Sequence, residues 1–534
     1  MVAKDVSVSR ETFEHEARTR VLGMEIHTTV FLGAAGIIIG AVLLALINAG
    51  SLQTALDATK AFLSTSIGWF YIIAVNVFLL FILYLLFSRY ATIRIGGPDA
   101  RPEFGTLSWL AMLFSAGMGV GLYFNGVYEP VSIYASPPLA AAETRTAAQE
   151  ALGFVHLHWA LHPWATYAVL ALVIAFFVYN RGLPMAVRSA FYPLLGDRIY
   201  GWIGNVVDII AIIATLFGVA TSLGLGAEQI NAGLNYLYNV PQDVVVQLFI
   251  ITLITTSATI SVISGLNAGI RQLSRVALVL GAVLLVLVFV LGPTPALLDT
   301  ILQSSGYYLQ QLPFLSTWSE AFQEPGSNWQ SDWTIAYWAW WISWAPFVGI
   351  FIARISKGRT IREFILGVLF VPAIISMLWF SVFGGAAFWV ELYGAGGLVE
   401  PILNDDAVAI FVFLEQFPLR SLTSLLALVG VTIFFITSSD SGSLVIDIIS
   451  AGGHTDPPTQ QRIFWAVLEG VVAGTLLLGG GLSALQTAVT MTGFPFAIVM
   501  LIAAYGLFIG LRRELRQLDA DKARAEEGAA SPAA

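Results

Sequence analysis

Residues 333–362 read WTIAYWAWWISWAPFVGIFIARISKGRTIR and join an apolar run with five tryptophans to a basic loop. An apolar run of about 20 residues is long enough to cross the hydrocarbon core of a bilayer as a helix. Lysine and arginine accumulate in short cytoplasmic loops, so the basic end predicts the inner side of the membrane. We therefore predict a membrane helix over residues 333–354 that ends in the cytoplasm.

The rest of the chain has the same apolar character. Of its 534 residues, 57% are hydrophobic and only 11% are charged, and the mean hydropathy is +0.79. A soluble protein of this composition would expose apolar surface and aggregate. We predict an all-α polytopic membrane protein with twelve transmembrane helices. The predicted helices cover residues 29–49, 66–88, 107–134, 155–180, 206–234, 243–267, 273–292, 333–354, 362–388, 420–450, 461–482 and 486–511.

The charged residues support this topology. With both termini in the cytoplasm, the 25 lysines and arginines fall in the tails or inner loops, except for Lys60, Arg145 and Arg420. We therefore expect a multi-pass protein of the inner cell membrane with both termini cytoplasmic. The net charge of −9 comes largely from outer loops and tails, so it does not indicate a nucleic-acid partner.

The chain is predicted to form one membrane domain over residues 29–511. Short tails over residues 1–28 and 512–534 flank it on the cytoplasmic side. Residues 293–332 form the longest predicted outer loop, and their apolar residues recur at helical spacing. This periodicity predicts a helix that lies along the surface.

Two predicted spans carry residues that favour an interruption of the helix. Gly117, Gly119 and Gly121 surround Met118 in the third span, and hydroxyl residues and an aspartate follow one another over residues 437–441. A discontinuous helix frees backbone N–H and C=O groups to bind charge near the bilayer midplane, as in transporters. The alternative is a seam of small residues that allows tight helix packing.

Aromatic residues form two stripes on predicted membrane helices. Trp159, Trp164 and Tyr167 fall within an arc of about 140° on one helix. A second stripe recurs every third residue from Trp338 through Trp341 and Trp344 to Phe347. Two facing stripes would form a box for a cation, because each aromatic face attracts positive charge by about 0.5–2 kcal/mol. An interfacial aromatic belt is the alternative, but Trp341 and Trp344 lie well inside their span.

Two further sets of polar residues could bind a metal ion. Phe434, Thr437 and Ser438 lie at i, i+3 and i+4, so two hydroxyls and a carbonyl could bind sodium, unless the hydroxyls bond back to their own helix. His158 and His162 have the i, i+4 spacing of a zinc site. The chain has no cysteine, and membrane histidines more often hydrogen-bond to a neighbour, so we favour a structural role for both histidines.

Five segments together resemble the betaine/choline/carnitine transporter family. They read GMGVGLYFNGVYEP (117–130), HWALHPWATY (158–167), TLFGVATSLGLG (215–226), YWAWWISWAPFVGIFIARISKGRTIREF (337–364) and FFITSSDSGS (434–443). The resemblance extends from residue 89 to residue 511. It implies a sodium-symporter-like core of two inverted five-helix repeats preceded by two extra helices.

In this chain the extra helices would occupy residues 29–88. The two repeats would occupy residues 107–292 and 333–511. The resemblance also suggests a homotrimer.

The resemblance implies a substrate site. The residues that match the family's aromatic box for a trimethylammonium group are Trp159, Trp164, Tyr167 and Trp341. Trp344 matches a ring on the inner side of the pathway. The positions that match the unwound segment near the substrate are Gly117, Met118, Gly119 and Gly121.

The resemblance implies sodium as the coupling ion, with no other cofactor. One sodium site would use the carbonyls of Ser115 and Met118 together with Phe434, Thr437 and Ser438. A second site would use Thr215, residue 219 and Phe347. Val219 offers no side-chain oxygen, although Ser222 on the face of Thr215 could substitute.

These matches imply sodium-coupled uptake of a methylated ammonium zwitterion by alternating access. The fifth span has no basic residue where sodium-independent exchangers place an arginine. Choline carriers tend to place an aspartate where this chain has Gly121, which favours glycine betaine, a solute that carries its own carboxylate. Dimethylsulfoniopropionate, choline, carnitine, ectoine and coupling to protons remain open.

A membrane enzyme or a channel is the alternative from another class. An enzyme would need a cluster of titratable groups, whereas Asp208, Glu228 and Glu469 are scattered along the sequence. A channel would conduct poorly through a box that binds its guest tightly. We therefore expect a carrier and not an enzyme.

Overall fold

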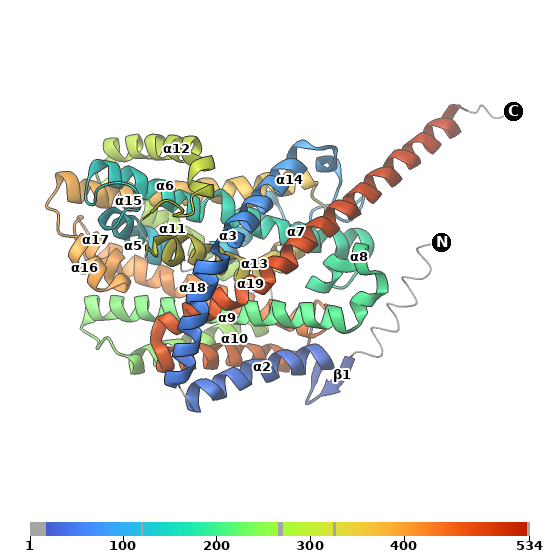
Figure 1. Ribbon diagram of the computed structural model, residues 1–534, viewed down its shortest axis with the longest axis horizontal. Helices are drawn as coiled ribbons and strands as arrows, with labels where there is room; N and C mark the ends of the chain where they lie inside the picture. Colours follow the sequence, from blue (N-terminus) through green and yellow to red (C-terminus); the bar gives the residue numbers. More distant parts are fainter. Residues whose placement is uncertain (1–17, 48, 119–120, 265–270, 324–326, 531–534) are drawn as a thin grey trace.

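The computed structural model describes residues 18–47, 49–118, 121–264, 271–323 and 327–530, and it is almost entirely helical (Figure 1). Within these residues, eleven helical stretches are long and apolar enough to cross a membrane. The prediction of an all-α polytopic membrane protein is therefore confirmed. The predicted count of twelve spans is not confirmed, because two shorter helices take the place of one span over residues 107–134.

A short β-hairpin, absent from the prediction, precedes the first helix. Strands β1 (Arg18–Val21) and β2 (Met24–His27) pair in antiparallel fashion. The two-residue turn between them contains Leu22 at φ 53° and Gly23 at φ 83°. Positive φ at both turn positions matches the right-handed twist of the flanking strands, which is why so short a loop can join them.

The predicted span over residues 155–180 is two helices joined at Ala160, whose backbone has φ −98° and ψ −109°. Pro163 lies in the first turn of the second helix, where its missing N–H costs no hydrogen bond. The polar start of the first helix lowers its hydropathy, so the prediction began about ten residues too late. The helices of this half are α2 (Thr28–Ile47), α3 (Ala49–Phe87), α4 (Thr106–Met118), α5 (Gly121–Ala135), α6 (Arg145–Trp159) and α7 (Leu161–Arg181). Short helical segments occupy Arg89–Thr92, Val187–Phe191, Tyr192–Leu195 (α8) and Gly196–Tyr200.

The second half begins with α9 and includes the predicted surface helix, α12, which packs on α6 and α15 at one end of the molecule (Figure 1). Its helices are α9 (Trp202–Tyr238), α10 (Val244–Ser264), α11 (Arg271–Leu291), α12 (Thr294–Thr317), α13 (Ala336–Ile355), α14 (Ile361–Ile365), α15 (Val371–Tyr393), α16 (Val399–Asn404), α17 (Ala409–Leu414), α18 (Arg420–Ser450) and α19 (Thr459–Ala530). One π-helical turn, Ser331–Ile335, leads into α13, and another, Leu366–Phe370, joins α14 to α15. A short helical turn, Asp406–Val408, precedes α17.

The predicted interruption at residues 437–441 is wrong, because α18 is one continuous helix. The hydroxyl of Thr437 donates to Ile433 O at 2.8 Å, and that of Ser443 donates to Ser439 O at 2.9 Å. Hydroxyls that bond back to carbonyls one turn earlier are satisfied inside an intact helix. At the other predicted interruption, residues 119 and 120 lie outside the described residues.

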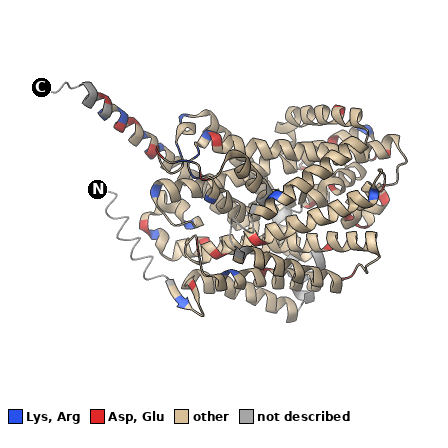
Figure 2. Ribbon diagram, turned by 180° about the vertical axis from the view of Figure 1, so that it is seen from behind, with Lys and Arg blue, Asp and Glu red and all other residues tan. Residues whose placement is uncertain are grey.

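α19 combines two candidate spans, Thr459–Gly479 and Ala484–Arg524, and continues past the predicted end of the last span (Figure 2). Its part beyond residue 511 contacts the end of α7 and the short helical segment after α3. Arg89 lies 3.1 Å from Asp519, and Arg181 lies 2.7 Å from Glu514. Figure 2 shows the β1–β2 hairpin and the projecting end of α19 on the same side of the helical body.

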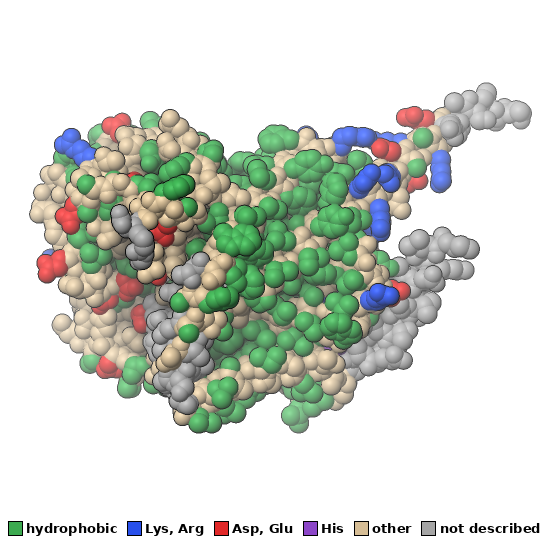
Figure 3. Space-filling model, in the orientation of Figure 1, with side chains coloured by type: hydrophobic (Ala, Val, Ile, Leu, Met, Phe, Trp, Pro, Cys, Tyr) green, Lys and Arg blue, Asp and Glu red, His purple; other side chains and the backbone are tan. Residues whose placement is uncertain are grey.

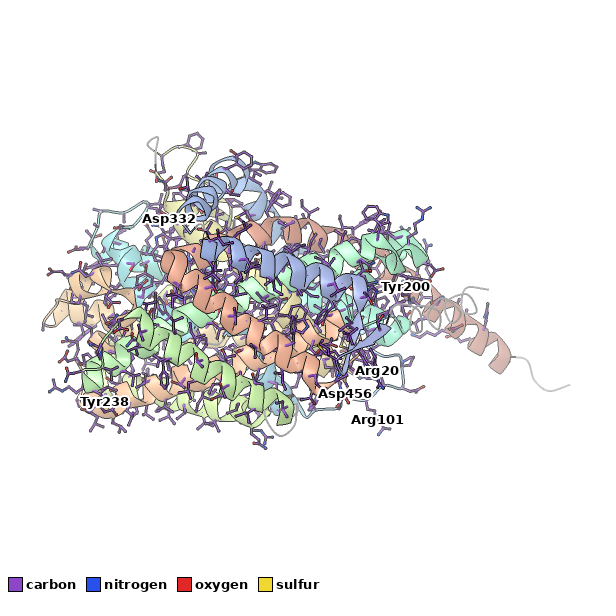
Figure 4. The ribbon with its side chains drawn as sticks, turned by 90° about the horizontal axis from the view of Figure 1, so that it is seen from below. Arg20, Arg101, Tyr200, Tyr238, Asp332 and Asp456 are labelled. Atoms are coloured by element: carbon purple, nitrogen blue, oxygen red, sulfur yellow. The ribbon has the colours of Figure 1, made fainter. Side chains whose placement is uncertain are left out.

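The surface separates into an apolar band and two polar ends. Figure 3 shows acidic side chains mainly at one end, basic ones mainly at the end near the chain termini, and apolar side chains between them. Figure 4 shows Asp332 and Tyr238 at one end, and Arg20, Arg101 and Asp456 at the other. Large apolar side chains such as those in the band would face lipid, where they cost nothing to expose. Acidic and basic side chains of the described residues thus gather mainly at opposite ends of the molecule. The assignment of the basic end to the cytoplasm stays a prediction.

Candidate functional site

Four aromatic side chains from three helices meet in the interior. α6 ends at Trp159, α7 carries Trp164 and Tyr167, and α13 carries Trp341. The ring centroid of Trp341 lies 4.9 Å from that of Trp159 and 6.1 Å from that of Tyr167. The rings of Trp164 and Tyr167 lie 5.6 Å apart, and all three pairs have the favoured edge-to-face geometry. Each of the four side chains is at most 2% exposed, so the predicted aromatic residues lie together away from bulk water.

Two glycines of the predicted unwound segment allow these rings to approach the backbone. A β-carbon on Gly117 would lie 2.6 Å from the ring of Trp164, and one on Gly121 would lie 2.5 Å from the ring of Trp159. Both distances are shorter than a van der Waals contact, so the two positions require glycine unless the rings move. Met118 is buried at the end of α4, whereas Gly119 lies outside the described residues.

A buried carboxylate that the sequence analysis missed holds the outer edge of this aromatic cluster. Glu129 on α5 is fully buried, and its Oε2 accepts hydrogen bonds from Trp159 Nε1 and Tyr337 Oη, each at 2.6 Å. His158 Nδ1 lies 2.7 Å from Glu129 Oε1, and Trp341 Nε1 donates to His158 O at 2.9 Å. Hydrogen bonds to an ionised acceptor are shorter and stronger than neutral ones. Glu129 therefore contacts the Trp159, Tyr337 and His158 side chains directly, and residue His158 connects it to Trp341.

A cavity of about 370 Å³ adjoins the aromatic cluster on the side of Tyr337 and Trp340. Trp340 stacks on Trp341 at 5.2 Å, and Tyr337 lies 5.5 Å from Trp159, so these two rings separate the cavity from the cluster. The aromatic residues of its lining are Phe124, Tyr128, Trp333, Tyr337 and Trp340. The polar residues of its lining are Asn125, Thr221, Asp332, Asp406, Gln486 and Thr490. Its volume is typical of a site for a small ligand.

The cavity is lined by two carboxylates, those of Asp332 and Asp406. Figure 4 shows Asp332 at the end of the molecule opposite Arg20 and Asp456. Asp332 lies in the π-helical turn before α13, and Asp406 lies in the loop before α17. Burial, followed by the nearby charge of Asp405, raises the pKa of the Asp406 carboxyl above its ordinary range. Ionised carboxylates at the mouth of a partly desolvated cavity attract cations.

The residues of the first predicted sodium site come from two helices that pack together, α4 and α18. Phe434 lies 5.7 Å from the Tyr123 ring. Thr437 bonds back to its own helix, as the alternative interpretation expected. Ser438 Oγ is buried and finds no hydrogen-bond partner among the residues that the structure describes. The side chain of Ser115 lies outside the described part.

The residues of the second predicted sodium site lie where α9 packs against α13. Thr215 is fully buried, and its hydroxyl lacks a partner within the described chain. Phe347 is also buried, and its ring lies 5.4 Å from that of Trp344. Ser222 Oγ lies 3.4 Å from Gly218 O, so the proposed substitute for Val219 already contacts its own helix.

Trp338 and the histidines play a different part from the box residues. The ring centroid of Trp338 lies 5.4 Å from that of His162, so Trp338 packs on a histidine and is not part of the aromatic cluster. The break at Ala160 places His158 on α6 and His162 on α7, and His158 Nε2 hydrogen-bonds to Thr334. These contacts fit the structural role favoured above. Among the residues described, no group of three or more metal-ligating side chains occurs.

Sequence reasoning missed Glu129, Tyr337 and Trp340, although each has a recognisable signal. A carboxylate inside an apolar span is itself a reason to suspect function, and Glu129 lies in the glycine-rich motif before Pro130. Tyr337 and Trp340 belong to the tryptophan-rich run but fall off its three-residue stripe. Only the packing of α13 against α5 and α6 reveals that they matter.

The family model described as BCCT, betaine/carnitine/choline family transporter, matches residues 29–516. A glycine betaine/proline/choline transporter of Vibrio parahaemolyticus is 43% identical, with 92% of each chain covered. The glycine betaine transporter OpuD of Bacillus subtilis is 43% identical, covering 92% of this chain and 96% of its own length. A solved Na⁺-coupled sialic acid symporter aligns with 82% of this chain at 14% identity and a TM-score of 0.42.

Proposed function

Because the chain belongs to the betaine/carnitine/choline transporter family, we propose that this transporter couples inward sodium flow to the uptake of a quaternary ammonium zwitterion, glycine betaine. Transport would proceed by alternating access, with the helix groups moving around the aromatic cluster. The protein would lie in the inner membrane with both termini in the cytoplasm. We further propose that it assembles as a homotrimer.

The observation that carries the choice of substrate class is the buried cluster of Trp159, Trp164, Tyr167 and Trp341. Desolvated aromatic rings stabilise a quaternary ammonium group by about 2 kcal/mol each in the best cases. The group needs no hydrogen bonds and loses little by leaving water, so rings suit it better than they suit a primary amine. Glu129 fixes the orientation of Trp159 at the edge of the cluster.

Unpartnered donors in the cluster support a ligand that also carries a carboxylate. Trp164 Nε1 and Tyr167 Oη are fully buried, and neither has a hydrogen-bond partner in the described part of the chain. A buried donor without a partner costs about 1–3 kcal/mol. A bound carboxylate would remove this cost, whereas a simple cation such as choline would not to the same degree.

Sodium coupling is supported by the polar surface between α4 and α18. Ser438 of α18 has a buried hydroxyl without a partner among the described residues, α18 packs against α4, and sodium prefers hydroxyl and carbonyl oxygens. We assign one sodium ion to Ser115, Met118, Phe434, Thr437 and Ser438. Because α18 is a continuous helix, its backbone carbonyls are used within the helix. The carbonyl ligands of the sodium ion would therefore come from the end of α4. Binding at such a junction favours the conformation in which both helices supply ligands.

The outer cavity favours choline as the second candidate substrate. Asp332 and Asp406 would attract a net cation more strongly than a zwitterion. The Vibrio relative is named as a transporter of glycine betaine, proline and choline, so one member of the family handles both kinds of solute. Dimethylsulfoniopropionate, carnitine and ectoine are further candidate solutes, and a proton is the second candidate for the coupling ion.

Equilibrium binding to the purified protein tests the substrate assignment. Quenching of tryptophan fluorescence is measured against glycine betaine, choline, carnitine, dimethylsulfoniopropionate, ectoine and proline at fixed sodium concentration. We expect the tightest binding for glycine betaine, and a loss of about tenfold or more in Trp341→Ala. Tighter binding of choline would transfer the assignment to that solute, and binding unaffected in Trp341→Ala would exclude the aromatic cluster as the site.

A further inference from the structure

Two fully buried carboxylates lie close together between α18 and α19, away from the aromatic cluster. Asp440 Oδ2 accepts a hydrogen bond from Ser261 Oγ of α10 at 2.5 Å, and Asp440 Oδ1 accepts one from Ser441 Oγ at 3.1 Å. Glu469 Oε2 accepts a hydrogen bond from Ser443 Oγ at 2.8 Å. Neither Asp440 nor Glu469 has any exposed surface. Ser443, which contacts Glu469, follows Asp440 by three residues on α18, so the two carboxyl groups lie on neighbouring parts of the same helix face. These hydroxyl and carboxyl side chains therefore form one polar cluster inside membrane-spanning helices.

No basic side chain compensates this cluster in the part of the chain that the structure describes. The nearest arginine on α19, Arg462, forms ion pairs with Asp447 at 3.2 Å and Asp456 at 2.7 Å. On α9, Asp208 is held by Arg188 at 2.5 Å. Glu228, the other acidic residue of α9, lies near Asp405 and Asp406. On α13, Arg354 faces Glu103. Charged groups inside a membrane protein are costly unless they are paired, and they generally mark ion pathways or binding sites.

An independent feature points to a missing ligand. Ser439 Oγ and Glu469 Oε1 both lack a partner at hydrogen-bond distance among the described residues. Ser439 is only 1% exposed, so water at the surface does not satisfy its hydroxyl. Ser439 lies one helical turn before Ser443, which contacts Glu469, so the two unsatisfied oxygens lie on the same side of α18 and a bound cation would give both a partner.

The cluster lies on the opposite face of α18 from the first proposed sodium site. At about 100° per residue, Ser439, Asp440 and Ser443 are centred opposite Phe434, Thr437 and Ser438. The partners differ accordingly, because Asp440 contacts α10 and Ser443 contacts α19, whereas Phe434 packs on α5. The two sets of oxygens therefore cannot bind the same ion.

The cluster adjoins the second predicted sodium site, which lacks a ligand. A β-carbon on Gly442 would lie 2.7 Å from Val219 Cγ2 and 3.6 Å from Glu469 Oε1. Glu469 therefore lies just across Gly442 from the valine that offers no oxygen. Because Gly442 has no side chain, α18 can approach α9 closely, and the Glu469 carboxylate can lie near Val219.

We propose that Asp440 and Glu469, with Ser439 and Ser443, bind a monovalent cation, either sodium or a proton. The proposal rests on the proposed function, since the cation would be an additional coupling ion for solute uptake. Carboxylate and hydroxyl oxygens, which these four side chains supply, are the ligand type that a hard cation prefers. A proton shared by the two carboxylates would neutralise one of the charges instead.

The test counts cations bound to the purified protein. Binding of ²²Na⁺ is measured in detergent at two pH values for the wild type, Asp440→Asn, Glu469→Gln and the double variant Asp440→Asn/Glu469→Gln. Glu400→Gln, which removes a carboxylate of α16 in the outer loop, is the matched control. If sodium occupies the cluster, the double variant binds one fewer ion per chain than the wild type, and Glu400→Gln binds the same number.

Proton uptake identifies the other source. If the cluster takes a proton, ²²Na⁺ binding is unchanged in the double variant, but solute-dependent acidification of proteoliposomes is lost. Unchanged sodium binding together with unchanged proton uptake would overturn the proposal. Thermal unfolding is measured in parallel, and Ser439→Ala serves as a charge-conserving second variant that should weaken cation affinity while the chain stays folded. The sodium count does not depend on transport, so a failure of the proposed function would appear separately, as no solute uptake by the wild type.

Discussion

Replacing Glu129 by glutamine should weaken solute binding without unfolding the protein. The glutamine has nearly the same shape, and its amide oxygen can still accept from Trp159 and Tyr337 at the position of Oε2. Its NH₂ group would face His158 Nδ1, which can accept a hydrogen bond after a change of tautomer. Glu129→Gln therefore removes the negative charge of the side chain but preserves its hydrogen bonds to Trp159, Tyr337 and His158.

The loss can be estimated from the three contacts. A hydrogen bond to a charged group contributes about 1.5–3 kcal/mol and a neutral one about 0.5–1.5 kcal/mol, so each contact weakens by about 1 kcal/mol. The three contacts together lose about 3 kcal/mol. If half of this loss is expressed as weaker ligand binding, because the rings are held less firmly, the binding free energy falls by about 1.5 kcal/mol, or roughly tenfold in affinity. Glu129→Ala should do more, because it leaves buried donors without any partner.

The assay is uptake of glycine betaine by proteoliposomes, with KM and maximal rate measured separately. We expect Glu129→Gln to raise KM about tenfold with little change in maximal rate. Glu150→Gln is the control, since Glu150 is a buried carboxylate of α6 that bonds to Leu139 N instead of the box rings. Equal effects of the two variants, or an unchanged KM in Glu129→Gln, would refute the positioning role.

Three further predictions concern packing, stability and pH. Gly121→Ala should raise KM by about tenfold or more in the same uptake assay, because the added methyl group displaces a box ring, whereas Gly36→Ala, with open space around it, should behave like the wild type. Asp208→Asn should lower the unfolding free energy by about 3–5 kcal/mol, because it leaves Arg188 buried without its charge partner; an unchanged melting temperature in detergent would contradict this. Burial raises the pKa of Asp406 above its ordinary value of 3.8, so its stabilising contribution is complete below that value and is lost as pH rises through the folded-state pKa. Asp406→Asn should therefore melt at a higher temperature than the wild type at pH 7 but not at pH 4, and a gain at both values would contradict the sign.

The fold was predictable where composition and periodicity dominate. Long apolar runs and the alternation of basic loops indicated the membrane class and most helix positions, because the bilayer leaves backbone few options besides a helix. Local backbone choices were less visible. The break at Ala160 lies inside one uninterrupted apolar run, so hydropathy alone does not reveal it, and in α18 hydroxyls such as that of Thr437 bond to carbonyls one turn earlier in an intact helix. The two inverted repeats remain a prediction.

The site was predictable only in part, because it is assembled from distant segments. Trp159, Trp164, Tyr167 and Trp341 were found from their stripes and from the family resemblance, and the structure brings them together. Their binding role remains a proposal. Glu129 was not found, since a single carboxylate in an apolar span has no periodicity. The pairing of Asp440 with Glu469 was invisible for another reason, namely that only the packing of α18 against α19 makes scattered acids into neighbours.

Sodium-driven accumulation of solute tests the central claim most directly. Proteoliposomes are given an inward sodium gradient of about tenfold, and the final ratio of internal to external radiolabelled glycine betaine is measured, with potassium in place of sodium as the control. We predict accumulation above unity that rises by about tenfold for each coupled sodium ion, since each ion contributes the free energy of its own gradient. Trp341→Ala should abolish this accumulation under the same conditions. Equilibration to a ratio of one with either cation would contradict sodium-coupled transport.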